Sequence, residues 1–235
     1  MTYQQTVQTT ATIEGIGLHS GDMIHLEIQP APPNTGLVFC RVDLEEPVSI
    51  PVCLDNVDWS QLQLATTLRR GEAEVKTCEH LLSAMMAACI DNAFIMIDGP
   101  EVPILDGSAA PFWEMLQRAG VKQQAVVRKV LRIKKSFSFE LDGKKCWVEP
   151  SREFRVEYEI DFTHPTIGYQ KKQLDILVDA YGDQVAPART FGFLQDVEYL
   201  KSKGLIQGGS MENAIVLDSD ATVSDGPNDQ AGTQQ

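Results

Sequence analysis

The residues with the clearest chemical potential are Glu79 and His80, which lie side by side just after Thr77. Thr77 is the expected start of a helix, and the positive end of a helix dipole favours a neutral imidazole, the form that binds metals. An adjacent carboxylate could then take a proton from metal-activated water. Short motifs of this kind are more often structural than catalytic. No His-x-x-x-His or His-Glu-x-x-His run nominates further zinc ligands.

Other candidate residues are less informative. His25 sits in an alternating segment and is predicted to be a surface or edge side chain, whereas His164, before Pro165, is either a turn residue or a pocket rim. The glycine-rich stretch 15–21 is not a dinucleotide loop, because its third glycine comes one residue late and a strand follows. The segment 189–193 places two aromatic residues after a cation, which suits a core or a wall for a sugar or acyl group equally well.

Hydrophobic periodicity indicates the elements that position these residues in the first half of the chain. The hydroxyl of Thr77 is expected to cap a helix whose apolar face continues to Cys89, and a second helix is expected between Ser108 and Gly120. Strands are expected at 8–15, 23–29, 37–41 and 93–97.

The pattern resets near residues 121–126, which predicts a domain boundary there. Strands at 126–139 and 145–160 are expected to pair across the turn Asp142–Gly143. A short helix at 194–203, ended by Gly204, and a strand at 214–217 follow, and residues 219–235 read as a frayed polar tail. The order of elements predicts an α+β fold and not a parallel βαβ series.

Composition restricts the partners and the compartment. The chain of 235 residues has a net charge of −13, which argues against a nucleic-acid or anionic-membrane binder but leaves room for a local basic pocket. Five scattered cysteines without a Cys-x-x-Cys pair predict reduced, mostly buried thiols and a cytoplasmic protein. The N-terminus shows no secretory signal, and the apolar run 81–90 is too short to be a transmembrane segment.

Several segments together resemble a known family. They are Ile13-Glu-Gly-Ile-Gly-Leu-His-Ser-Gly21, Thr77-Cys-Glu-His-Leu-Leu-Ser-Ala84, Glu101-Val-Pro-Ile-Leu-Asp-Gly-Ser-Ala-Ala-Pro-Phe112, Ala188-Arg-Thr-Phe-Gly-Phe193 and Asn213-Ala-Ile-Val216. With these motifs in this order, the chain from about Thr9 to Gly226 strongly resembles the UDP-3-O-acyl-N-acetylglucosamine deacetylase (LpxC) family. Members of this family are zinc enzymes that catalyse the committed step of lipid A synthesis. Five co-linear motifs are far more specific than any one of them.

The resemblance implies two similar α+β domains, each a β-sheet packed on helices, with the site between them. The expected units are 1–123, carrying Glu79 and His80, and 124–235, an incomplete second domain. The implied activity is zinc-dependent hydrolysis of the acetamide of a UDP-linked, 3-O-acylated glucosamine. His80 matches a zinc ligand, Glu79 the base that activates the zinc-bound water, and Thr190 the threonine that helps to polarise the amide carbonyl.

The resemblance also implies residues that bind the substrate. An apolar passage for the acyl chain is expected from Leu18, Leu194, Val197, Ile206, Gly209, Ser210 and Val216. Phe191 matches the glucosamine wall and Phe162 a position near the nucleotide, while His19 lies close to the site with either a structural or a catalytic role. The implied partner is the small-molecule substrate, and the resemblance leaves the oligomeric state open.

The chain departs from the family towards its end. The family takes its second and third zinc ligands from a later helix beginning His-Lys-x-x-Asp, and its general-acid histidine from further on, whereas this sequence has no histidine after His164. We therefore expect a C-terminally incomplete deacetylase whose own activity is in question. One alternative is a noncatalytic relative that binds acylated nucleotide sugar or a protein partner. Another, a zinc site completed by His19, His164 or Asp196, carries little weight because catalytic geometry rarely survives loss of a scaffold element.

Overall fold

The N-terminal half of the protein is built on a five-stranded mixed sheet. The computed structural model describes residues 2–62, 64–176, 178–202 and 204–218. The strand order is β2-β3-β8-β4-β5, with β4 and β8 parallel and the other neighbours antiparallel. The strands are β2 (Ala11–Ile16), β3 (Met23–Pro30), β4 (Leu37–Arg41), β5 (Val48–Pro51) and β8 (Ala93–Ile97). Alternation in β3 turns Ile24, Leu26 and Ile28 into the core.

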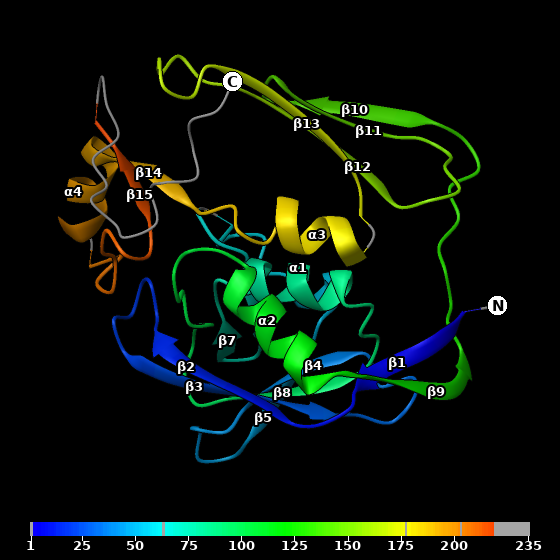
Figure 1. The fold of residues 1–235 in the computed structure, drawn as a ribbon. Helices are drawn as coiled ribbons and strands as arrows, with labels where there is room; N and C mark the ends of the chain where they lie inside the picture. The colour runs from blue at the N-terminus through cyan, green and yellow to red at the C-terminus, as the bar shows by residue number, and fades with distance from the viewer. Residues whose placement is uncertain (1, 63, 177, 203, 219–235) are drawn as a thin grey trace.

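Helices α1 (Glu79–Ala87) and α2 (Ala110–Ala119) pack on one face of this sheet (Figure 1). The apolar side of α1 and the Phe112, Met115 and Leu116 side chains of α2 are buried in the same cluster as Phe39 and Ile95 of the sheet. Smaller elements border this layer: η1 (Leu54–Asn56), β6 (Leu68–Arg70) and β7 (Ala73–Val75). The first turn of α1 is thereby held on a packed layer of helices and sheet.

The strand after α2 returns to the start of the chain. Strand β9 (Val121–Val127) pairs antiparallel with β1 (Tyr3–Val7), with Val7 opposite Val121. The domain boundary expected at 123/124 therefore falls inside β9.

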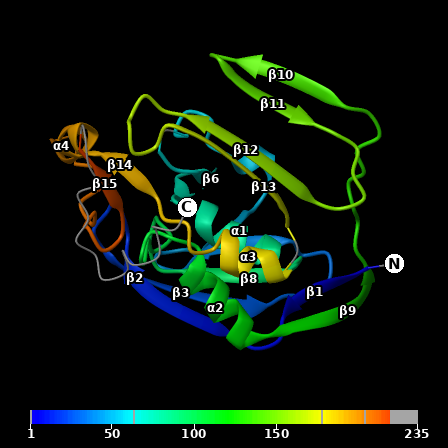
Figure 2. The same cartoon turned by 45° about the horizontal axis from the view of Figure 1, so that its top comes forward.

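Two β-hairpins follow, β10 (Phe137–Leu141) with β11 (Lys144–Val148) and β12 (Arg155–Asp161) with β13 (Tyr169–Asp175). Positive φ angles at Asp142 (50°) and Gly143 (72°) confirm the predicted turn. The predicted pairing of 126–139 with 145–160 was too long, because β9 takes its beginning and β12 pairs with β13. Figures 1 and 2 show both hairpins beyond the helices, away from the five-stranded sheet.

The remaining elements return to the helical side of the N-terminal layer. In α3 (Val178–Gln184) the buried Tyr181 forms a hydrogen bond of 2.9 Å with the Ser83 hydroxyl, and its ring centroid lies 5.1 Å from that of Trp113. Strand β14 (Phe191–Phe193), helix α4 (Leu194–Ser202) and strand β15 (Ile215–Leu217) follow, with β14 and β15 parallel. The expected tail, 219–235, lies outside the described residues.

The structure confirms a mixed fold of sheets with few helices, and it corrects two further local predictions. Helix α1 begins at Glu79 and has no side-chain cap, because the Thr77 hydroxyl donates to Glu101 instead. The cysteines are free as predicted but not mostly buried, since only Cys78 of the five is fully buried. Among the described residues, no helix is long and apolar enough to cross a membrane.

Candidate functional site

Glu79 and His80 form the first turn of α1, where the chain emerges from the loop that follows β7. The buried face of the helix, Leu81, Ala84, Met85 and Ala87, fixes the helix against the sheet, while Glu79 and His80 are both half-buried at its end. One carboxylate oxygen of Glu79 accepts a hydrogen bond from the backbone N–H of Thr66 at 3.0 Å. This hydrogen bond orients the carboxylate, and among the described residues its other oxygen accepts no hydrogen bond.

The environment of His80 favours its neutral form. Burial lowers the pKa of the imidazole below its usual value, against the opposing charges of Glu79 and Asp106. An uncharged imidazole beside a carboxylate suits metal binding, as the sequence suggested. The interaction with Asp106 also places the loop before α2 beside the first turn of α1.

The loop of residues 106–108 is a tight turn built around Gly107. One oxygen of Asp106 accepts hydrogen bonds from the backbone N–H and hydroxyl of Ser108, at 2.9 and 2.8 Å. Gly107 has a φ of 82°, and a side chain there would begin 2.0 Å from the carbonyl oxygen of Asn213. Only glycine allows the backbone of 213 to approach this closely.

Thr190 joins this turn from the distant part of the chain. Its N–H donates to the carbonyl of Gly107 at 2.8 Å, and its own carbonyl accepts from Ile215 at 3.0 Å. Arg189 strengthens the same contact, because its guanidinium donates to the carbonyls of Asp106 (2.8 Å) and Glu212 (2.7 Å). The structure therefore places Thr190 against the turn that neighbours His80, although 110 residues separate the two in sequence.

The glycine-rich loop with Leu18 and His19 closes on the loop after α4. The carbonyls of Leu18 and His19 accept hydrogen bonds from Gly208 (3.1 Å) and Gln207 (3.3 Å). Within the described part of the chain, the buried Nδ1 atom of His19 finds no hydrogen-bond partner.

The residues expected to line the acyl passage are brought together only in part. A side chain at Gly209 would meet Ile206 and Leu18 at 3.5 and 3.7 Å, so these three positions adjoin one another. Ser210 follows in a turn closed by the Asn213 side chain. Leu194 and Val197 are half-buried on α4, and Val216 is buried in β15.

The two aromatic residues expected at the sugar and the nucleotide lie in contact. The ring centroids of Phe162 and Phe191 are 5.6 Å apart in an edge-to-face arrangement, and Phe193 packs on both. The His164 ring is tilted by 45° against that of Phe193, with 5.7 Å between the ring centroids, and its Nε2 donates to the carbonyl of Asp218 at 2.6 Å. The loop after β12 therefore meets β14 through an aromatic cluster.

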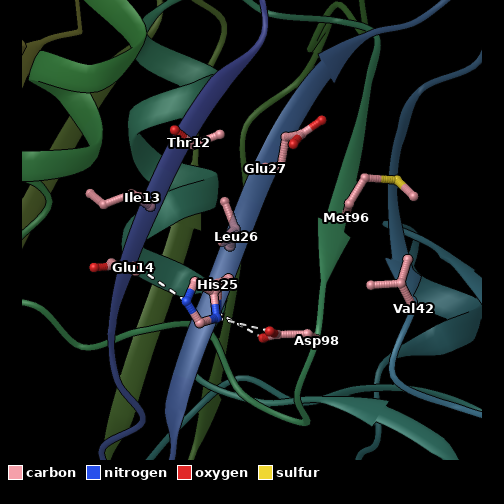
Figure 3. Close-up of a pocket in the computed structure, with 9 residues that line it drawn as sticks. All are labelled: Thr12, Ile13, Glu14, His25, Leu26, Glu27, Val42, Met96 and Asp98. Carbon is pink, nitrogen blue, oxygen red and sulfur yellow. Dashed lines mark hydrogen bonds and ion pairs between the residues drawn. The ribbon is translucent and has the colours of Figure 1, made fainter.

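His25 lies apart from these residues, on the open face of the five-stranded sheet. Figure 3 shows its imidazole between Glu14 and Asp98, and the contacts are 3.1 and 2.9 Å; Met96 and Val42 line the same pocket. The side chain of His25 is 61% exposed. The prediction of a surface side chain is confirmed.

Sequence reasoning assigned no role to three residues that hold the site: Glu101, Asp106 and Arg189. All three lie in the motifs that carry the resemblance, which was the available signal. No spacing rule links Arg189 to the carbonyl of Asp106, because the contact depends on the tertiary fold.

The thiol next to the site provides a test of the local environment. Burial, with the charge of Glu79, raises the pKa of Cys78 to about 12, so at pH 8 almost none of it is thiolate. We expect iodoacetamide to alkylate the exposed Cys53 and Cys146 in the native protein and Cys78 only after denaturation. Peptide mass spectrometry checks this, and alkylation of native Cys78 at the rate of Cys53 would contradict the described packing.

Comparisons with known proteins place these residues in a wider context. The model of a family described as UDP-3-O-acyl N-acetylglycosamine deacetylase matches residues 4–230. A UDP-3-O-acyl-N-acetylglucosamine deacetylase from Geobacter sp. (strain M21) is 45% identical over 224 residues, which are 95% of this chain and 73% of the relative. Proteins of the same name from Myxococcus xanthus (47% identity; 92% and 68%) and Shewanella sp. (45%; 93% and 72%) are similar to a comparable extent. The matched range contains every candidate site residue described in this subsection.

Proposed function

Because the chain belongs to the UDP-3-O-acyl N-acetylglycosamine deacetylase family, we propose that it hydrolyses the N-acetyl group of UDP-3-O-acyl-N-acetylglucosamine, an early step of lipid A biosynthesis. The observation that carries the proposal is the meeting of two distant segments. Glu79 and His80 begin α1, and Thr190 is hydrogen-bonded to the turn beside them. These are the residue types that amide hydrolysis requires: a base, a metal ligand and a hydroxyl donor.

Each side chain has a distinct part in this proposal. The carboxylate of Glu79, held through the Thr66 N–H, accepts a proton from the attacking water. The hydroxyl of Thr190 donates a hydrogen bond to the amide oxygen as negative charge develops on it. Arg189 binds three backbone carbonyls around Thr190, and this network keeps the hydroxyl in place as the reaction proceeds.

We propose zinc as the cofactor, with His80 as one ligand. When bound, zinc lowers the pKa of a water and polarises the amide carbonyl. A catalytic zinc site needs three protein ligands. The residues that the structure describes contain no group of three or more His, Cys, Asp or Glu side chains arranged to hold a metal. His80 therefore fits as a ligand, but the described residues do not make a complete site, since His80 forms no such group with His19, His164 or Asp196.

Substrate binding is proposed to use the two surfaces that adjoin Thr190. Leu18, Ile206 and Gly209 form an apolar contact suited to the acyl chain, with Leu194, Val197, Ser210 and Val216 extending it. The cluster of Phe162 and Phe191 offers ring faces for the sugar and nucleotide. His19, whose Nδ1 atom is buried without a described partner, is placed to meet a polar group of the ligand.

The wider organisation is proposed on the same footing. We infer two α+β domains that meet at about residues 123/124, with the site between them, and a cytoplasmic location in keeping with the reduced thiols. The partner is the small-molecule substrate and not a nucleic acid.

One observation favours a noncatalytic alternative, in which the protein binds acylated nucleotide sugar or a protein partner without hydrolysis. The described residues contain no group of three or more His, Cys, Asp or Glu side chains that could hold a metal. Glu79 and Thr190 would then be binding groups only.

A single set of measurements on the purified chain separates the two functions. If the deacetylase function is correct, elemental analysis finds bound zinc, and the chain releases acetate from UDP-3-O-acyl-N-acetylglucosamine in a reaction that a chelator abolishes and added zinc restores. If the substrate raises the melting temperature but no acetate forms at any zinc concentration, the noncatalytic function is correct. If neither binding nor turnover occurs, both proposals are wrong for this chain.

A further inference from the structure

Glu101 is a buried carboxylate that the proposed reaction does not use. It is 1% exposed, and none of the ion pairs among the described residues involves it. Its oxygens accept hydrogen bonds from the backbone N–H of His19 (3.0 and 3.1 Å) and of Ser20 (3.1 Å) and from the Thr77 hydroxyl (2.8 Å). Burying a carboxylate costs free energy unless its oxygens accept hydrogen bonds. The hydrogen bonds to Glu101 offset this cost and tie their donors to one buried group.

The three donors come from two segments that border the candidate site. His19 and Ser20 belong to the glycine-rich loop, whereas Thr77 lies two residues before Glu79. Backbone pairing supports the same junction, because Lys76 pairs with Glu101 and Gly17 with Pro103. Glu101 therefore lies between the loop with Leu18 and His19 and the entrance to α1.

Two backbone features adapt the chain to this carboxylate. Thr77 has a φ of 56°, an unfavourable angle for a β-branched residue, and its hydroxyl is bound to Glu101 rather than to the helix end. A side chain at Gly17 would begin 2.8 Å from the nearer oxygen of Glu101, so glycine lets the loop amides reach the carboxylate. Both segments are shaped around one acceptor.

We propose that Glu101 is a positioning residue of the deacetylation site: it fixes the loop of residues 17–20 relative to the first turn of α1. The Leu18 and His19 carbonyls of that loop bind Gly208 and Gln207, so its position also sets where the apolar surface of Leu18 and Ile206 stands relative to Glu79 and His80. The effect of Glu101 on deacetylation rests on the proposed function. The connection that Glu101 makes between residues 17–20 and α1 does not.

The chemistry of the acceptor distinguishes positioning from simple filling of space. Glutamine has nearly the shape of glutamate, but its amide nitrogen donates and would face donors. One oxygen can still accept the loop amides while the Thr77 hydroxyl reverses its role, so Glu101→Gln should keep a weakened connection. Glu101→Ala removes the acceptor and leaves two N–H groups unpaired.

Hydrogen exchange measures the connection directly, without any need for activity. We expect the amides of His19 and Ser20 to exchange roughly 10- to 100-fold faster in Glu101→Ala and by a smaller factor in Glu101→Gln, as loss of hydrogen bonds to a charged acceptor implies. Amides of α2 should change little. The control is Ile50→Ala, a buried residue of β5, which destabilises the protein elsewhere.

Kinetics then test the link to the site. In Glu101→Gln we expect KM for the acylated substrate to rise roughly 10-fold while kcat falls much less, because loop position affects binding more than the reacting groups. Ile50→Ala should leave KM unchanged at temperatures where it is folded. The proposal is wrong if, in Glu101→Gln, the amides of His19 and Ser20 exchange at the wild-type rate and KM equals that of wild type. It is also wrong if Ile50→Ala raises KM as much as Glu101→Gln does. If wild type forms no product, the proposed function fails instead, and exchange at residues 17–20 still decides the connection made by Glu101.

Discussion

Replacing Glu79 with Gln is expected to lower kcat/KM for deacetylation by roughly 10²- to 10⁴-fold, the usual effect of removing a general base. In the wild type, the Thr66 N–H donates to a Glu79 oxygen at 3.0 Å. Glutamine retains an oxygen that can accept this hydrogen bond, so the first turn of α1 should keep its structure. What is lost is the ability to take a proton from water. The melting temperature should therefore stay close to that of wild type.

The matched control for this change is Glu114→Gln, which makes the same substitution at an exposed position on α2. It should have the activity of wild type. Assays of both variants with UDP-3-O-acyl-N-acetylglucosamine, at equal zinc content, give the comparison. Wild-type turnover by Glu79→Gln, with an unchanged fold, would remove Glu79 from the mechanism.

Replacing Gly107 with Ala is expected to reduce the free energy of unfolding by about 2–4 kcal/mol, through an unfavourable φ and a steric clash. The new methyl carbon would begin 2.0 Å from the Asn213 carbonyl oxygen, and backbone cannot move aside as a flexible side chain can. The segment with Thr190 must then shift away from the turn, because its N–H is bound to the Gly107 carbonyl. Activity should fall along with stability.

Gly192→Ala is the matched control for Gly107→Ala. Gly192 lies in β14, two residues after Thr190, and a side chain there meets nothing within 4 Å. Its effect on stability should stay within about 0.5 kcal/mol, as for ordinary surface changes. Chemical denaturation of both variants provides the measurement, and equal losses would show that the contact between Gly107 and Asn213 is unimportant.

Local features of the fold were predictable because neighbouring residues determine them. Asp142 and Gly143 both adopt positive φ, so the turn of the β10–β11 hairpin follows from two residues alone. Gly204 likewise follows the helix that it was expected to end. Pairing of Val7 with Val121 had no such signal, since it joins segments more than a hundred residues apart.

The candidate site shows the same division between local and distant determinants. Glu79 and His80 could be singled out because they are adjacent at the start of a helix. The start of α1 was misjudged because the Thr77 hydroxyl binds Glu101, 24 residues away, and this partner cannot be read from helix-capping rules. The meeting of Thr190 with Gly107 depends on a turn that only the folded chain brings into place.

The contact between Gly107 and Thr190 also has a consequence for protein synthesis. The carbonyl of Thr190 accepts a hydrogen bond from the N–H of Ile215. The Thr190 hydroxyl therefore takes its final position only after residue 215 has left the ribosome. Glu79 and His80 leave the ribosome much earlier, and the sheet that carries them is already formed by then, since N-terminal units generally fold first during translation. A nascent chain arrested before β15 should therefore have a folded five-stranded sheet with its helices, but Thr190 should not be in place beside Glu79 and His80.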